Sequence, residues 1–420
     1  MNNAKITTLE NGLRIVTCNM PHLRTATTAA VVNTGSRYED VSVNGISHFL
    51  EHLVFKGGET RSAFDIAHQV EMVGSSMNAY TSKEKTAFYI KSLSEHIELS
   101  VDIIADLVIN ASFPQEELDR ERGVVLQEMA MRNDSPDATC YDLYDTVAYP
   151  NQNYGRTILG EEEVIKNVTR EDLKNYVNTH YVTGNMAVVC AGLVDHDNFV
   201  ELVKKYFANL PVGTRTTPEK AEYVGGHSSY NKNFDQVNLL LGFKTCTVYD
   251  DDDNAYDVLS DVLGGGMSSP LFTEVREKRG LVYSVSSFAG QGTDQGDFGI
   301  YAGTTPENLD ELFDVVCTEL KKLTSEINEH DLLRSKNQIK ARMLMSLENP
   351  FNVVMKTVSD LFTFGYVKDI DEEVKKIEAI TADDLKRVAS NLLSTVPTLM
   401  LVGGNVDSET YYNKVQTLIS

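Results

Sequence analysis

Residues 44–58 read NGISHFLEHLVFKGG and hold His48 and His52, four positions apart, with Glu51 directly before the second histidine. Apolar residues recur around them at helical spacing, which predicts a helix from Ile46 to about Phe55. At about 100° per residue, the two imidazoles and the carboxylate project over one face roughly 100° wide. Two neutral imidazoles at this spacing can bind one Zn²⁺, with the glutamate placed to take a proton from water. A helix with two half-buried histidines that bind no metal is the open alternative.

A catalytic zinc site needs a third protein ligand and an open position for water. The stretch ERGVVLQEM, residues 121–129, offers Glu121 and Glu128, which are seven positions apart and share one face of a predicted helix. Either carboxylate could be the third ligand, and the other could support a histidine through a hydrogen bond. The residue pattern alone leaves this choice open.

Strand-like and helix-like stretches follow a similar order in both halves of the chain. The first half opens on strands, continues with helices and a predicted hairpin at residues 76–93, and ends on the buried strand NMAVVCAGLV, residues 185–194. The order restarts with QVNLLLGFKT at residue 236, and the late strand TLMLVGG matches the first half's last strand. This pattern predicts two related α+β half-domains.

The domain boundaries follow from the segment between the two halves. We predict a catalytic zinc-binding domain over residues 1–212, a linker over 213–229 and a C-terminal domain over 230–420. The linker segment is rich in glycine and polar residues and holds few large apolar side chains, which is typical of a connection between domains.

The bulk composition excludes several classes of protein. No apolar run reaches the roughly 18 residues of a membrane-spanning helix, and the N-terminal residues lack the zones of a signal peptide. The scattered, odd set of cysteines argues against a disulfide framework and for a reducing compartment: Cys18, Cys140, Cys190, Cys246 and Cys317. We therefore expect a location in the bacterial cytoplasm, or in the mitochondrial matrix if the source is eukaryotic.

The formal net charge is −23. A polyanionic chain repels nucleic acid and anionic membrane surfaces and attracts basic ligands, so we expect neither nucleic-acid binding nor membrane insertion. Solubility alone is an equally simple reason for the charge.

The segments HFLEHLVFKG and ERGVVLQEM together resemble the M16 metallopeptidases, the clan of pitrilysin and insulin-degrading enzyme. The resemblance spans nearly the whole chain and includes NGLRIV, NAYTSKEKTAFY, YGRTILG and LGGGMSSPLFTEVREKRGLVYSV. The chain length fits the M16B subfamily of mitochondrial processing peptidase (beta subunit) and its bacterial homologues. The resemblance implies an α+β, LuxS/MPP-like metallohydrolase fold, with two homologous half-domains that are each a mostly antiparallel sheet covered by helices.

The resemblance also implies a role for each residue of the metal site. In the family the third ligand is a glutamate about 76 residues past the second histidine, and Glu128 lies 76 positions after His52. This implies one Zn²⁺ per chain bound by His48, His52 and Glu128. Glu51 is then the general base and Glu121 takes the place of the family's supporting acid.

Four further positions are implied to contact the substrate. Asn78 and Ala79 match the pair on the family's edge strand, which holds the substrate backbone by strand addition. A plain sheet edge is the simpler alternative for that strand. Arg276 and Tyr283 match the family's Arg/Tyr pair, which is expected to bind the substrate carbonyl and stabilise the developing oxyanion.

The chain departs from the family's pattern at two places. Processing peptidases bind a substrate arginine with two acids, and Asp142 falls at one of those positions while Ala138 stands at the other. Neighbouring Asp137 is an alternative partner, so arginine specificity is less well supported than peptidase activity. After GGGMSS the family commonly carries arginine, and this chain has Pro270, for which the sequence offers no functional reason.

The expected activity is zinc-dependent endopeptidase cleavage of peptides or of basic, extended, presequence-like segments. One chain supplies two of the four domains that enclose substrate in this family, which implies a homodimer or a heterodimer with a related subunit. The main rival is a catalytically inactive, core-type structural subunit, and a metal-binding regulator is a third reading. Core-type relatives typically have degraded metal motifs, so the intact motif favours the enzyme.

Overall fold

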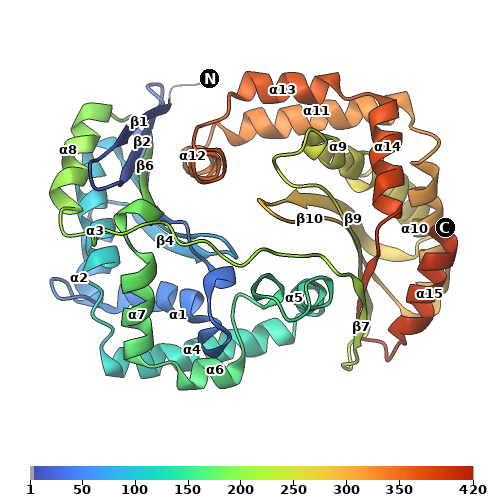
Figure 1. The fold of residues 1–420 in the computed structure, drawn as a ribbon, viewed down its shortest axis with the longest axis horizontal. Coiled ribbons are helices and arrows are strands. Elements are labelled where there is room, and N and C mark those ends of the chain that lie inside the picture. The colour runs from blue at the N-terminus through green and yellow to red at the C-terminus, as the bar shows by residue number, and fades with distance from the viewer. Residues whose placement is uncertain (1–3, 420) are drawn as a thin grey trace. The chain divides into compact units, whose positions relative to one another are not determined.

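The computed structural model describes residues 4–419, which form two compact units. The first unit comprises the described residues up to Ala130 together with Arg156–Glu219 and Leu344–Ile370. The second comprises Met131–Gly155, Lys220–Met343 and the described residues from Asp371 onward. Each unit is built around one β-sheet with helices packed on it (Figure 1).

The elements have the following bounds. The strands are β1 (Ala4–Thr8), β2 (Arg14–Asn19), β3 (Thr25–Val32), β4 (Ser76–Thr81), β5 (Thr86–Leu93), β6 (Met186–Gly192), β7 (Gly226–Tyr230), β8 (Val237–Lys244), β9 (Val282–Gln291), β10 (Gly296–Thr304) and β11 (Thr398–Val402). The helices are α1 (Ile46–Leu53), α2 (Ala63–Met72), α3 (Ile97–Ile109), α4 (Gln115–Asn133), α5 (Pro136–Ala148), α6 (Glu162–Asn167), α7 (Arg170–His180), α8 (His196–Tyr206), α9 (Asp253–Gly264), α10 (Leu309–Lys322), α11 (Glu329–Ser346), α12 (Pro350–Phe364), α13 (Ile370–Ala379), α14 (Ala382–Leu393) and α15 (Ser408–Ile419). Two short segments also matter, the 3-10 helix η3 (Val54–Lys56) and the π-helix η7 (Phe272–Glu277). None of the helices in the described part of the chain is long and apolar enough to cross a membrane.

The two sheets repeat one topology. The first has the strand order β1-β2-β6-β3-β5-β4 and the second the order β7-β11-β8-β10-β9. Leaving β1 aside, the neighbours correspond one by one, because β2–β6 and β7–β11 are parallel and every other pair is antiparallel. The predicted α+β class, with two related and mostly antiparallel sheets covered by helices, is confirmed.

The central strands of each sheet are buried on both faces. In the first unit α1, α3, α7 and α8 cover one face, and the apolar side chains of α12 cover the other. Strand β6 is therefore buried along its whole length, because its alternating side chains enter two different cores. The second unit is built in the same way, with α9, α10, α14 and α15 on one face of the sheet and α5 on the other.

The helices α5 and α12 are exchanged between the two halves of the chain. The first half contributes α5 to the second unit, and the second half contributes α12 to the first unit. In Figure 1, α12 lies with the blue and green elements, and α5 lies with the strands of the second sheet. The compact units thus interleave along the chain, whereas the predicted division at 1–212, 213–229 and 230–420 is sequential and stays a prediction of domain boundaries.

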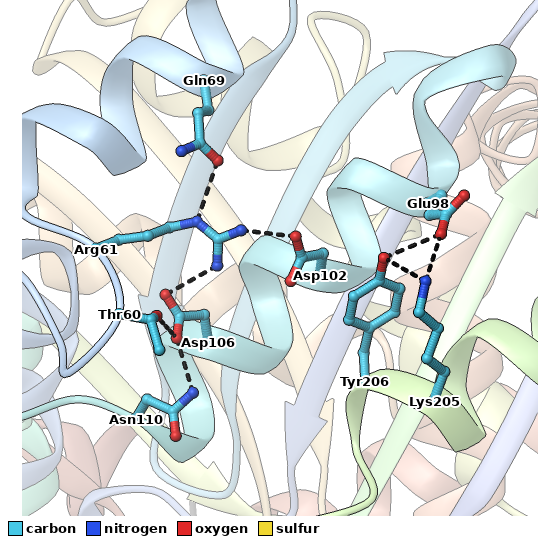
Figure 2. A network of polar contacts seen from close by, with 9 residues as sticks. All are labelled: Thr60, Arg61, Gln69, Glu98, Asp102, Asp106, Asn110, Lys205 and Tyr206. Atoms are coloured by element: carbon cyan, nitrogen blue, oxygen red, sulfur yellow. Dashed lines mark hydrogen bonds and ion pairs between the residues drawn. The ribbon is translucent and has the colours of Figure 1, made fainter.

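A polar network holds the loop after η3 against α3. Arg61 in this loop donates to Asp102 (2.6 Å) and Asp106 (3.0 Å) on α3, and to Gln69 on α2 (3.1 Å), as Figure 2 shows. Thr60 donates a further hydrogen bond to Asp106. Asp106 is 6% exposed, so the paired guanidinium compensates a carboxylate that would otherwise be buried alone. The loop that follows the histidine helix is therefore anchored on both sides.

Candidate metal centre

The histidine helix α1 is positioned by a buried acid at its N-terminus. Gly45 precedes the helix with φ 96°, and a Cβ there would lie 2.5 Å from the Leu159 carbonyl oxygen, so only glycine fits. The Glu39 carboxylate accepts hydrogen bonds from the backbone N–H of Gly45 (2.7 Å) and of Ser47 (2.8 Å). Burial raises the pKa of Glu39, and these hydrogen bonds oppose the rise. The sequence analysis missed this acid, although it lies only seven positions before the first residue of the helix.

The two faces of α1 have different surroundings. Ile46, Phe49, Leu50 and Leu53 are fully buried in the core of the first unit. The histidines and Glu51 occupy the other face, with His48 8% exposed and the other two half-buried. The helical spacing therefore directs the chemistry-bearing side chains away from the core, as the sequence predicts.

Helix α4 brings Glu128 to the two histidines. His48 Nε2 lies 3.6 Å from one Glu128 carboxylate oxygen, and His52 Nε2 lies 3.4 Å from the other. One ligand atom from each residue lies within 4.8 Å of the others. Ligands that are each 2.0–2.1 Å from a tetrahedral zinc ion are about 3.3 Å apart, so these separations and the N, N, O donor set fit Zn²⁺. Among the described residues, this is the group that could hold a metal ion.

A second acid and a lysine fix the orientation of His52. Glu121 is 4% exposed, and its carboxylate lies 3.3 Å from His52 Nδ1 and 2.9 Å from Lys56 Nζ. If Nδ1 carries the proton and donates to Glu121, the lone pair of Nε2 faces Glu128 and a metal ion. Lys56 was missed in the sequence analysis, yet it lies four positions after His52, one helical turn away on the same side of the chain.

Glu51 lies beside the cluster without belonging to the ligand group. Its Oε2 accepts a 2.6 Å hydrogen bond from the Thr81 hydroxyl at the end of β4. Burial raises the pKa of Glu51, while Thr81 and His52 lower it and the nearby Glu128 carboxylate raises it further. The arrangement offers a desolvated carboxylate next to a metal position, which is what a general base requires.

Comparison with known proteins decides the family. Residues 14–162 match the family described as insulinase (peptidase family M16), and residues 167–339 match the peptidase M16 inactive domain. An uncharacterized zinc protease of Rickettsia felis is 36% identical over 405 residues, which cover 96% of this chain and 98% of that protein. The chain belongs to the M16 peptidase family. The predicted M16 resemblance and the assignment to the metalloproteases are thereby confirmed.

Two further comparisons place the chain within the M16 family. A probable mitochondrial-processing peptidase subunit beta of Arabidopsis thaliana is 32% identical over 425 residues, covering 98% of this chain and 80% of that protein. The crystal structure of a protease from Helicobacter pylori superimposes with a TM-score of 0.89 at 26% identity, covering 96% of this chain and 100% of that one. The similarity to processing peptidases predicted from the motifs is also confirmed.

The predicted strand-addition residues of this M16 chain lie on a sheet edge. Asn78 and Ala79 belong to β4, the last strand of the first sheet, which pairs with β5. Asn78 Oδ1 accepts a 2.8 Å hydrogen bond from the Ala79 backbone N–H. Because β4 ends at Thr81, the hydroxyl that contacts Glu51 lies at the end of this edge strand. The structure thus connects the edge strand with the metal cluster inside one unit.

The predicted Arg/Tyr pair is formed in the second unit. Arg276 on η7 lies over the Tyr283 ring, 5.3 Å from its centre, and over the Phe272 ring, 4.7 Å from its centre. Tyr283 on β9 is 79% exposed. Arg276 is half-buried, so the exposed Tyr283 ring lies beside a partly covered guanidinium. The metal cluster, in contrast, belongs to the first unit.

The predicted arginine-binding acid Asp142 already has an arginine partner. Arg132 of α4 contacts both carboxylate oxygens of Asp142 on α5, through Nη2 at 2.9 Å and through Nε. Asp137, the alternative acid, accepts a hydrogen bond from Ser135 at the start of α5. The Arg132 guanidinium therefore already pairs with the Asp142 carboxylate, which was expected to bind a substrate arginine. The sequence analysis did not identify Arg132 as the partner of Asp142.

Proposed function

We propose that this M16 chain is a zinc-dependent endopeptidase that binds one Zn²⁺ per chain through His48, His52 and Glu128. The observation that carries the proposal is the cluster of these three side chains with Glu51 beside it. Zn²⁺ at this position would supply a Lewis acid that activates water and polarises a peptide carbonyl. Cleavage of an unstructured peptide before and after chelation tests the proposal, with Glu51→Gln as the matched variant.

The residues around the cluster have separate roles in this proposal. Glu51, oriented by Thr81, takes a proton from the attacking water and passes it to the leaving amide nitrogen. Glu121 holds His52 in one orientation through Nδ1. An extended peptide adds to the open side of β4 near Asn78 and Ala79, where backbone hydrogen bonds align it with the cluster.

The Arg276 and Tyr283 pair is proposed to stabilise charge on the substrate. The stacked guanidinium and the exposed phenol are both hydrogen-bond donors that suit a carbonyl oxygen as it becomes an oxyanion. Their assignment rests on the family motif and on their contact with each other in the second unit.

Basic peptides are expected to be the better substrates. With a net charge of −23, the chain should attract an arginine-containing peptide. At low salt, kcat/KM for this peptide should be about tenfold higher than for the same peptide with citrulline at the arginine positions. The difference should shrink as ionic strength rises. Cleavage assays at two salt concentrations measure it, and equal kcat/KM values without salt dependence contradict the expectation.

The Arg132→Gln variant tests Asp142 in the same assay. Removing the guanidinium frees the Asp142 carboxylate, so the variant should prefer the arginine peptide more strongly than the wild type does. A matched Arg120→Gln variant, whose side chain pairs with acids on its own helix, should show no such gain. An unchanged preference in Arg132→Gln would remove Asp142 from the substrate site.

A homodimer is the assembly that we propose. One chain carries both the metal cluster and the Arg/Tyr pair, so two copies can form complete sites. A relative is named as a probable subunit beta of mitochondrial-processing peptidase, which supports an assembly of more than one chain. Mass measurement in solution should give twice the chain mass of 46.7 kDa. A stable monomer contradicts this assembly, and a requirement for a second, related chain indicates the heterodimer instead.

The remaining expectations stay proposals. A cytoplasmic location in a bacterium is supported by the close bacterial relatives, and a mitochondrial matrix location applies if the source is eukaryotic. The rival function is a catalytically inactive core-type subunit, which would cleave nothing, and a metal-binding regulator would bind zinc without cleaving peptide. The complete cluster with Glu51 favours the enzyme.

A further inference from the structure

Helix α9 in the second unit repeats the burial pattern of α1. The two helices follow corresponding strands, β3 and β8, in the repeated topology. Their core-facing residues have identical spacing: Ile46, Phe49, Leu50, Leu53 and Val54 in the first unit, and Ala255, Val258, Leu259, Val262 and Leu263 in the second. This alignment matches His48 with Asp257 and His52 with Asp261.

Helix α11 repeats α4 in the same way. The buried residues are Leu118, Glu121 and Val125 on α4, and Leu332, Ser335 and Ile339 on α11. This alignment matches Glu128 with Arg342, and Glu121 with Ser335. The three metal-cluster positions and the supporting acid thus have counterparts in the second unit. Aspartates replace the two histidines, arginine replaces Glu128 and serine replaces Glu121.

One of the counterpart pairs is in direct contact. Arg342 Nη2 donates to Asp261 Oδ2 at 2.5 Å, just as Glu128 faces His52 in the first unit. Asp257 also interacts with the Arg342 charge, although burial and the neighbouring Asp253 raise the pKa of Asp257 to about 7. The Asp261 side chain is 4% exposed and the Arg342 side chain 58%, so solvent reaches the guanidinium from outside.

Three side-chain oxygen atoms on α9 and α11 lack a hydrogen-bond partner among the described residues. They are Asp261 Oδ1, Ser335 Oγ and Gln338 Oε1, and all three atoms are buried. The glycine run 264–266 lies close to two of these side chains, since a Cβ on Gly265 would lie 2.5 Å from the Asp261 carboxylate and a Cβ on Gly266 would lie 3.8 Å from Gln338 Oε1. A cluster of carboxylate, hydroxyl and amide oxygens is the ligand set that hard divalent cations such as Ca²⁺ prefer.

We propose that the guanidinium of Arg342 is the built-in cation of a second, metal-independent copy of the metal centre. In the first unit a metal ion would join α1 to α4, and in the second unit Arg342 joins α11 to α9 through Asp261. Removing the guanidinium leaves an oxygen-lined site that takes a divalent cation instead. The Arg342–Asp261 pair lies in the second unit and involves no histidine, so its response to Ca²⁺ does not depend on peptide cleavage.

The test is the thermal stability of the full chain with and without Ca²⁺. Arg342→Met keeps an unbranched apolar stem and removes the guanidinium charge, so Tm should fall by about 5 °C, and millimolar Ca²⁺ should restore most of the loss. The wild type and Arg342→Lys, which both keep a cation, should show no Ca²⁺-dependent shift. Ca²⁺ is a suitable probe because a His/His/Glu cluster is a poor site for it.

The controls decide whether Ca²⁺ acts at this site. In the double variant Arg342→Met with Asp261→Asn, the Ca²⁺ response should disappear. The proposal is overturned if Arg342→Met melts like the wild type, if Ca²⁺ does not raise its Tm, or if the double variant responds equally. Should Arg342→Met fail to fold alone, refolding yields with and without Ca²⁺ give the same comparison, and a yield that Ca²⁺ does not raise overturns the proposal.

Discussion

Glu51→Gln is expected to lower kcat for peptide cleavage by about a thousandfold while zinc remains bound. Glutamine has nearly the shape of glutamate and can still accept the hydrogen bond from Thr81, but it cannot take a proton from water. The ligand group consists of His48, His52 and Glu128, so this substitution leaves the metal ligands intact. The measurement is single-turnover cleavage of a peptide together with the zinc content of the same sample.

A matched control separates this effect from the loss of one negative charge. Glu71→Gln removes an exposed carboxylate from α2 and should leave kcat unchanged. Wild-type kcat in Glu51→Gln would contradict the role of Glu51 as the general base. A wild-type chain that binds zinc and cleaves no peptide would instead support the metal-binding regulator, and one that neither binds zinc nor cleaves peptide would support the core-type subunit.

A graded loss of zinc affinity is expected from Glu128→Gln, Glu121→Gln and Lys56→Met. Glu128 contributes a ligand oxygen, so its loss should weaken zinc binding by more than about a hundredfold. Glu121 acts through His52 Nδ1, so its loss should cost about ten- to a hundredfold. Lys56 acts through Glu121 alone, and its loss should cost less than the loss of Glu121.

Competition with a chromophoric chelator measures the three dissociation constants, and the melting temperature of the zinc-free proteins controls for folding. Lys56→Arg keeps a cation beside Glu121 and should recover most of the affinity that Lys56→Met loses. If Glu121→Gln lost zinc more completely than Glu128→Gln, the roles of the two acids would be exchanged. Equal losses in all three variants with lowered melting temperatures would indicate general destabilisation instead of ordered roles.

The metal site shows what could be predicted from local sequence. Residues within one helix have fixed relative directions, so the spacing of His48, Glu51 and His52 placed them on one face without a structure. The residue pattern could not choose between Glu121 and Glu128, because both lie on one face of α4. Only the packing of α4 against α1 brings Glu128 to both Nε2 atoms and Glu121 to Nδ1.

The contacts that the sequence analysis missed join residues on different elements of the chain. Lys56 and Thr81 each orient an acid of the site, and Arg132 neutralises Asp142, yet none carries a pattern that names its partner. A charged side chain has no sequence signature for pairing, because its partner is set by which helices meet. For the same reason, the sequence does not indicate that Arg342 pairs with Asp261. The correspondence of Arg342 with Glu128 appears only when the two units are aligned by their buried residues.

The sequence by itself determined the elements, the repeated α+β pattern and the helix face that carries HFLEH, since period and turn chemistry are local properties of the chain. The tertiary structure alone decided that α5 and α12 are exchanged between the halves. A helix with one apolar face can bury that face against any apolar sheet. Its sequence pattern therefore does not indicate which of two similar sheets the helix covers. In the structure, α12 covers the second face of the first sheet and α5 covers the second face of the second sheet.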